Sequence, residues 1–299
     1  MLKALVFDFD GVIVDTEAEW YYIYKEWLKK TYDYDLKVND YLVCVGANSQ
    51  NLFRFIKKEL GDHVPIDEFE KEATQDYIER TNRLPAMEGV KELIIRAKSE
   101  GLKLAIATSA TRKKPVTQLK RLGLLDYFDA FSTAELSENI KPAPDIFLKA
   151  AELLDCKPEE CLAIEDSLNG LIAAQRASMP CLIVPNMITK DSPFTGYYKM
   201  VNSLKDIDLS EIESYFLKKV AISLFIKVPF VVMIYEILNS LHTSDKYCTH
   251  FFIILKYNNG SPPKNCISTF FSQSCFINFP NCTISDLLKH LLSLSTKQY

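Results

Sequence analysis

The chain has 299 residues, and its 35 Lys and Arg against 39 Asp and Glu give a net charge of −4 at pH 7. This balance carries no basic bias of the kind that favours nucleic acid, so we expect no nucleic-acid partner. The eight cysteines form no CxxC pair and no His/Cys spacing typical of zinc sites. Met1 leads directly into an acidic segment without a basic and then apolar leader, and we therefore expect a cytoplasmic protein.

Residues 3–15, KALVFDFDGVIVD, form a short apolar run with two carboxylates near its end. The run is too short for a helix and is typical of a strand buried on both faces. Side chains alternate along a strand, so Asp8 and Asp10 should point to the same side, with Phe9 opposite. Buried carboxylates must be paired or bind a metal, and we therefore expect a cation beside this pair.

Residues 16–83 contain helical patterns and little that is typical of strands. Apolar residues recur there at three- and four-residue spacing, which predicts three helices. The first follows Asp15, the second ends at Gly61, and the third is capped by Asp67. Because this block lies between two predicted strands, we expect an inserted helical lid.

Strands and helices alternate from residue 84 onwards. The predicted strands cover residues 104–107, 131–133, 161–164 and 181–184. The predicted helices cover residues 88–100, 116–122, 145–155, 169–178 and a closing region at 203–216. This alternation predicts an α/β fold with a doubly wound parallel sheet, in which ligands bind at the carboxyl ends of the strands.

Two predicted loops carry polar residues that could bind a phosphate: the loop after the strand at 104–107 and the loop before the helix at 145–155. Thr108 and Ser109 follow a strand in the sequence IATSA, where hydroxyl and backbone N–H groups can donate to a phosphate. A Ser/Thr turn explains them equally well when they are taken alone. Lys141 precedes a proline in KPAPDIF, either as a phosphate-facing cation or as an ordinary solvated lysine.

An acidic pair ends the strand predicted at residues 161–164. Glu165 and Asp166, in IEDSLNG, offer hard oxygen ligands of the kind that Mg²⁺ prefers. The alternative is a helix N-cap, formed by Asp166 or Ser167. Taken together, the strand ends bring acidic, hydroxyl and ammonium groups to one edge of the predicted sheet.

The sequence DFDGVIVDTE resembles the first signature of the haloacid dehalogenase-like hydrolases, and IATSA, KPAPDIF and IEDSLNG follow in the order of that family. The resemblance covers about residues 1–213. It implies a Rossmann-like core, residues 1–15 and 84–216, with a helical cap domain, residues 16–83.

The resemblance also implies site roles. Asp8 is expected to be the nucleophile that forms an aspartyl-phosphate, and Asp10 the general acid and base. Thr108, Ser109 and Lys141 are expected to bind the phosphate. A Mg²⁺ cofactor is expected to be held by Asp8, the backbone carbonyl of Asp10, Asp166 and, in support, Glu165.

Asp10 argues for phosphate esters, because the family's dehalogenases lack this second aspartate. Sugar phosphomutases of the family carry an arginine close after the glycine that corresponds to Gly46, whereas this chain has Ala47-Asn48-Ser49. We therefore expect a phosphatase, monomeric, acting on a small phosphorylated metabolite such as a sugar phosphate or nucleotide-type compound. A phosphomutase and a catalytically inactive interaction protein are the alternatives.

The charge of the chain changes near residue 216. Residues 1–216 hold 27 Lys and Arg and 36 Asp and Glu, whereas residues 217–299 hold 8 and 3 and resemble no family. The apolar stretch at 220–241 is long enough to suggest a membrane helix, but it is interrupted by Lys227, Pro229 and Glu236. A charge near the bilayer centre is costly, so we expect no membrane span and an atypical, poorly ordered extension.

Overall fold

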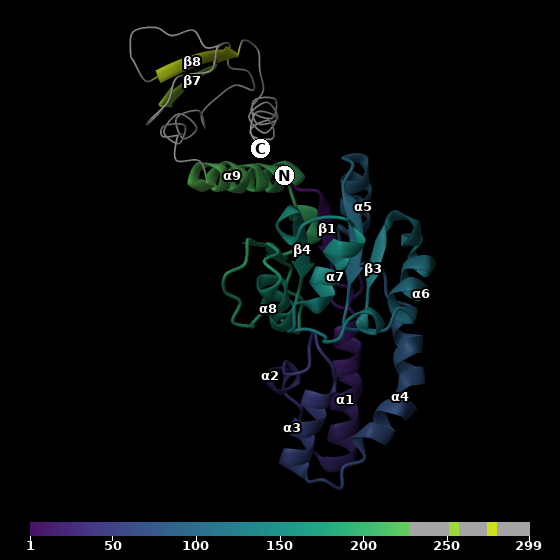
Figure 1. Cartoon of the computed structure of the whole chain (residues 1–299). Coiled ribbons are helices and arrows are strands. Elements are labelled where there is room, and N and C mark those ends of the chain that lie inside the picture. Colours follow the sequence, from purple (N-terminus) through teal and green to yellow (C-terminus); the bar gives the residue numbers. More distant parts are fainter. Residues whose placement is uncertain (228–250, 257–273, 280–299) are drawn as a thin grey trace. The chain divides into compact units, whose positions relative to one another are not determined.

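A six-stranded parallel sheet forms the centre of residues 1–216 (Figure 1). The computed structural model describes residues 1–227, 251–256 and 274–279, and its contacts divide the chain into Met1–Phe216 and Leu217–Tyr299. The strand order is β3-β2-β1-β4-β5-β6. The strands are β1 (Ala4–Phe7), β2 (Lys103–Ala107), β3 (Ala130–Ser132), β4 (Cys161–Glu165), β5 (Cys181–Ile183) and β6 (Lys199–Met200).

The parallel sheet and its helices confirm the predicted α/β fold. Each end of the strands predicted at 104–107, 131–133, 161–164 and 181–184 lies within one residue of the observed end. Strand β1 differs, because it ends at Phe7, before both aspartates. The sixth strand, β6, was not predicted, because two half-exposed residues carry no apolar run. Asp10 lies beyond the strand and forms an isolated bridge with Val14, so strand alternation does not set its direction.

Helices cover both faces of the sheet. On one face, α7 (Asp145–Leu153) and α8 (Leu168–Arg176) pack against small buried side chains such as Ala4 and Ala105. On the other face, larger side chains such as Leu5 and Phe7 meet α5 (Val90–Ser99), α6 (Lys113–Leu122) and the first part of α9 (Leu209–Lys227). Short 3₁₀ helices lie in the connections: η1 (Leu125–Tyr127), η2 (Ala134–Leu136), η3 (Pro158–Glu160) and η4 (Leu204–Asp206).

Strand β1 lies between β2 and β4, which explains its uninterrupted apolar sequence. The register pairs Phe7 with Ile106 on one side and with Ile164 on the other. The residues that follow β1, β2 and β4 are therefore brought to the same edge of the sheet. This is the edge at which parallel α/β sheets bind ligands.

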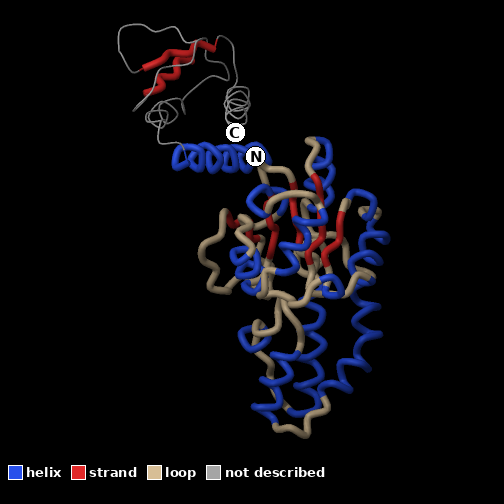
Figure 2. Tube along the Cα trace, in the orientation of Figure 1, coloured by secondary structure: helices blue, strands red, loops and turns tan. Residues whose placement is uncertain are grey.

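A separate helical lobe follows β1 directly. It consists of α1 (Thr16–Tyr32), α2 (Val38–Tyr41), α3 (Gln50–Leu60) and α4 (Ile66–Thr81), and Figures 1 and 2 show it beyond the edge of the sheet at which β1 ends. Its helices bury an apolar cluster of their own, and Trp27 stacks on Phe69 with ring centroids 3.9 Å apart. The predicted cap by Asp67 was wrong, because α4 begins one residue earlier and Pro65 occupies the N-cap position.

The C-terminal unit is described only in part. Helix α9 (Leu209–Lys227) extends beyond the closing helix predicted at 203–216, and β7 (Phe251–Lys256) pairs with β8 (Ser274–Phe279) in antiparallel fashion. A poorly ordered extension was expected for residues 217–299, and most of these residues lie outside the described ranges. Within those ranges, none of the helices combines the length and the apolar character that crossing a bilayer requires.

Candidate active site

Asp8 is the first residue after β1 and lies beside Glu165, the last residue of β4. Its backbone N–H donates to the carbonyl of Ile164 at 2.9 Å, which continues the ladder past the end of the strand. Because Phe7 pairs with Ile164, Asp8 stands level with Glu165. The side chains of Asp8, Glu165 and Asp166 are all buried. Two predicted site elements, 157 residues apart, thus share one polar centre inside an apolar core.

Lys141 supplies the cation that this acidic centre requires. Its ammonium donates to Oδ1 of Asp8 and, at 2.6 Å, to Oε1 of Glu165, and its side chain is 0% exposed. Burial alone would lower the pKa of Lys141, but the two carboxylates outweigh it and hold the pKa above its ordinary value. The alternative of a solvated lysine is therefore wrong.

Glu165 and Asp166 are held in different ways. Oε2 of Glu165 accepts hydrogen bonds from the backbone N–H groups of Asp166 and Ser167 and from the Ser167 hydroxyl. Oδ2 of Asp166 accepts a bond of 2.7 Å from the side-chain amide of Asn186. Ser167, and not Asp166, caps α8 by accepting from the N–H of Gly170. Asn186 was not identified from the sequence, because nothing in its local pattern marks it.

The three carboxylates fit a divalent cation. One ligand oxygen from each of Asp8, Glu165 and Asp166 lies within 4.8 Å of the other two. Burial is the largest cause that raises the pKa of Asp8 and Asp166, and the neighbouring carboxylates add to it. Hard oxygen donors with this concentrated negative charge suit Mg²⁺. The cluster contains three of the four predicted metal ligands, without the side chain of Asp10.

Close packing of α8 onto β4 places Glu165 in this cluster. A Cβ atom added at Gly170 would lie 1.9 Å from Oε1 of Glu165, far inside contact distance. Only a residue without a side chain allows this approach. The atom packed against Gly170 therefore belongs to the site itself.

Asp10 is turned away from the carboxylate cluster towards the helical lobe. Oδ1 of Asp10 accepts from the hydroxyl of Thr16, at the start of α1, and forms an ion pair with Lys114 of α6. Lys114 also lies over the ring of Tyr77, 5.2 Å from its centroid. Lys114 was missed, because one lysine near the start of an amphipathic helix is not distinctive in sequence.

Thr108 and Ser109 lie at the end of β2, beside the same edge. Thr108 is buried, and its hydroxyl oxygen accepts from the N–H of Ala110 at 3.1 Å, as in a Ser/Thr turn. The Ser109 hydroxyl donates to the carbonyl of Gly46, in the helical lobe, at 3.1 Å. Gly46 has a φ of +75°, and a Cβ there would meet Oγ of Ser167 at 2.2 Å. The Gly46 loop therefore touches the core on both sides of the site.

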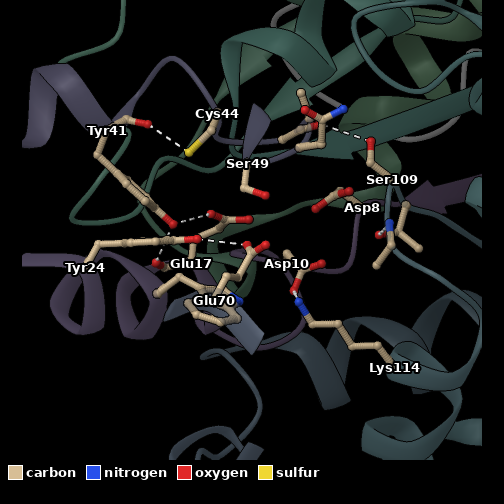
Figure 3. A pocket seen from close by; sticks show the side chains of 16 residues that line it. Asp8, Asp10, Glu17, Tyr24, Tyr41, Cys44, Ser49, Glu70, Ser109 and Lys114 are labelled. Atoms are coloured by element: carbon tan, nitrogen blue, oxygen red, sulfur yellow. Dashed lines mark hydrogen bonds and ion pairs between the residues drawn. The ribbon is translucent and has the colours of Figure 1, made fainter. Parts of the chain in front are cut away.

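A cavity of about 150 Å³ opens between these core residues and the helical lobe. Figure 3 shows Asp8, Asp10 and Ser109 on one side of it and Tyr24, Tyr41 and Cys44 on the other. From the lobe, Glu17 accepts from the Tyr41 hydroxyl at 3.2 Å and Glu70 accepts from Tyr24 at 2.8 Å. Burial, followed by the charge of Asp10, raises the pKa of Glu17 to about 7.

Known proteins resemble this chain in sequence and fold. The family model for haloacid dehalogenase-like hydrolases matches residues 5–184. YhcW of Bacillus subtilis (strain 168), which is named as a phosphatase, is 36% identical over 70% of this chain and 96% of its own. The crystal structure of CbbY from Rhodobacter sphaeroides in complex with phosphate is 27% identical, with a TM-score of 0.59, over 69% of this chain and 96% of CbbY.

A further solved structure shows the same fold at lower identity. The β-phosphoglucomutase of Clostridium difficile is 24% identical, with a TM-score of 0.62, over 74% of this chain and 100% of the mutase. The family match spans both the first strand and the acidic pair that meets it in space. The chain belongs to the haloacid dehalogenase-like hydrolases and is an enzyme of their phosphatase and phosphomutase group.

Proposed function

We propose that this enzyme is a Mg²⁺-dependent phosphatase that hydrolyses a small phosphomonoester through an aspartyl-phosphate intermediate. The observation that carries the proposal is the buried cluster in which Asp8 meets Lys141, Glu165 and Asp166. Lys141 is paired with Asp8 and Glu165, and Asp8 also lines the cavity, so a phosphoryl group that enters the cavity would meet the cluster at Asp8. The phosphate held by CbbY of Rhodobacter sphaeroides also supports a phosphorylated substrate.

In the proposed mechanism, the Asp8 carboxylate attacks phosphorus and the bond from phosphorus to the leaving oxygen breaks. Lys141, which contacts Asp8, and the hydroxyl of Thr108 stabilise the charge on the non-bridging oxygens. The Ser109 hydroxyl joins them by turning from the Gly46 carbonyl to the phosphate. Asp10 gives a proton to the leaving alcohol and later takes one from the water that attacks the aspartyl-phosphate. The products are the alcohol and inorganic phosphate.

Asp8, Asp166 and the backbone carbonyl of Asp10 would hold Mg²⁺, with Glu165 in support. When bound, the cation offsets the repulsion between the phosphoryl oxygens and the acidic residues. Glu165 already uses both carboxylate oxygens in contacts to Lys141 and to the turn after β4. Its main role in the proposal is therefore to hold Lys141 and the Asp166 turn in place.

Asp10 is suited to proton transfer by its position. It is anchored by Thr16 and Lys114 at the boundary between core and lobe, and it lines the cavity together with Asp8. A leaving group that occupies the cavity would thus meet Asp8 on its phosphorus side and Asp10 at the bridging oxygen.

The residues of the lobe loop support a phosphatase over a phosphomutase. Ala47, Asn48 and Ser49 line the cavity, whereas Arg54 is exposed and donates to Asn51. A mutase has to retain a phosphorylated intermediate and rebind it in the opposite orientation, which requires a second phosphate-binding cation. The loop offers the cavity no such group, so hydrolysis is the better-supported outcome.

The test is a phosphate-release screen with the full chain over a panel of phosphomonoesters, in Mg²⁺ and in EDTA. We expect release with Mg²⁺ and its loss in EDTA. Activity on sugar phosphates that yields an isomeric phosphate ester without free phosphate would instead identify a mutase. Absence of turnover for every ester would favour the inactive interaction protein.

A further inference from the structure

The cavity above Asp8 has an acidic far wall. Glu17, from α1, and Glu70, from α4, both line it, and Figure 3 shows their carboxylates facing the space beside Asp10. Each of the two accepts a hydrogen bond from a tyrosine hydroxyl, Tyr41 for Glu17 and Tyr24 for Glu70. These bonds leave lone pairs on both carboxylates available to a ligand, since an ionised carboxylate can accept about four hydrogen bonds.

The cavity offers little to a second anion. Among the 16 residues that line it, all of them in the described part of the chain, Lys114 alone carries a positive side chain. That ammonium is already paired with Asp10 and lies over the Tyr77 ring. The α3 N-terminus also reaches the cavity through Ser49, but the N–H of Gln50 is taken by the Asn48 side chain at 3.0 Å.

We propose that the substrate of this site is a monophosphate whose leaving alcohol presents hydroxyl or ammonium donors to Glu17 and Glu70 and bears no second negative charge. The inference rests on the proposed phosphatase function. It narrows the substrate class to monophosphate esters of polyhydroxy and amino alcohols. Bisphosphates and phosphorylated carboxylic acids are disfavoured, because their second anion would lie against the like charges of the acidic wall.

The test compares three esters that share a three-carbon skeleton: glycerol 3-phosphate, 1-amino-1-deoxyglycerol 3-phosphate and 3-phosphoglycerate. They differ only in the terminal group, which is a hydroxyl, an ammonium or a carboxylate. We expect kcat/KM for 3-phosphoglycerate to be at least about tenfold below that of each of the others. The ratio between the amino and hydroxyl esters then shows which donor the wall prefers. Where turnover is slow, inhibition constants against p-nitrophenyl phosphate give the same order.

The wall itself is tested by Glu70→Gln, which keeps the shape and the acceptor for Tyr24 but removes the charge. This variant should raise kcat/KM for 3-phosphoglycerate relative to glycerol 3-phosphate by about tenfold, mostly through KM. Glu72→Gln, an exposed position on the same helix, is the matched control and should leave the ratio unchanged.

Hydrolysis of p-nitrophenyl phosphate separates a failure of the acidic-wall inference from a failure of the proposed phosphatase function. If p-nitrophenyl phosphate is hydrolysed with Mg²⁺ but 3-phosphoglycerate matches or exceeds the other two esters, the acidic-wall inference is overturned and the phosphatase stands. An unchanged ratio in Glu70→Gln overturns it as well. If p-nitrophenyl phosphate is not hydrolysed, the proposed function fails and the inference fails with it.

Discussion

Lys141 donates a hydrogen bond of 2.6 Å from its buried ammonium to Oε1 of Glu165. The same ammonium contacts Asp8, so one cation joins the ends of β1 and β4. Removing one partner of such a buried pair leaves charges without compensation in the core, which is far more costly than removing a surface ion pair. The residue that serves the proposed chemistry therefore also stabilises the fold.

This relationship predicts the effect of Lys141→Met. In EDTA, we expect the free energy of unfolding to fall by about 3–5 kcal/mol, because Asp8 and Glu165 lose their only shared cation in the described site. Urea denaturation measures the change. The matched control is Lys149→Met, whose exposed ion pair with Glu152 should be worth about 0–1 kcal/mol. Equal losses in the two variants would contradict the assigned role.

Magnesium should stabilise the protein more at high pH. Burial holds the pKa of Asp8 and Asp166 in the folded state above the ordinary value. The metal-free fold therefore loses stability as the pH rises from the pKa of these groups in the unfolded state through their raised pKa in the folded state. Mg²⁺ binding has to displace protons from these groups and is therefore favoured as the pH rises.

We expect the rise in Tm on adding Mg²⁺ to be larger at pH 8 than at pH 5.5, as measured by calorimetry at a fixed metal concentration. Asp166→Asn should abolish most of the rise, whereas the exposed Asp62→Asn should not. A rise that is independent of pH, or that survives Asp166→Asn, would show that Mg²⁺ binds elsewhere.

Asp10→Asn should separate the two proton transfers. An alkyl phosphate needs its leaving oxygen protonated, so we expect kcat to fall by about 10²–10⁴. The p-nitrophenolate group leaves without a proton, so the first turnover of p-nitrophenyl phosphate should persist. The second step, which needs Asp10 as a base, should stall.

Stopped-flow absorbance would then show a burst of about one p-nitrophenol per protein, followed by slow release. An equal loss of rate for both esters from the first turnover would mean that Asp10 acts on binding or metal retention and not on proton transfer.

Gly170→Ala should reduce activity although it favours the helix. Alanine is better than glycine within a helix by about 1 kcal/mol. However, its Cβ would lie 1.9 Å from Oε1 of Glu165, so Glu165 has to move and release Lys141. We expect kcat/KM to fall by at least about tenfold, since small displacements of positioning groups cost about that much or more. Unchanged activity would mean that Glu165 can shift without consequence.

The sheet and most of the site could be predicted because both follow from local sequence. The strands around β1 are buried on both faces, so they stand out as apolar runs, and polar residues directly after them reach a common edge. Asp8, Thr108 and the pair Glu165–Asp166 were located in this way.

The rest depended on tertiary contacts that no local pattern records. Lys114 and Asn186 each become part of the site through one side-chain contact, to Asp10 and Asp166. Strand β6 has only two residues, and its pairing with β5 arises from the neighbouring strand and not from its own composition. The acidic wall is also invisible in sequence, because Glu17 and Glu70 lie on different helices of the lobe.

The proposed reaction requires a covalent bond between Asp8 and phosphorus. The most direct measurement is acid-quenched peptide mass spectrometry of Asp10→Asn during its reaction with p-nitrophenyl phosphate and Mg²⁺. We expect a phosphoryl group on the peptide that contains Asp8, and no phosphoryl group there when Asp8→Asn is combined with Asp10→Asn. A reaction that releases p-nitrophenol without any phosphorylated peptide, or with the phosphoryl group on another residue, would contradict the proposed reaction.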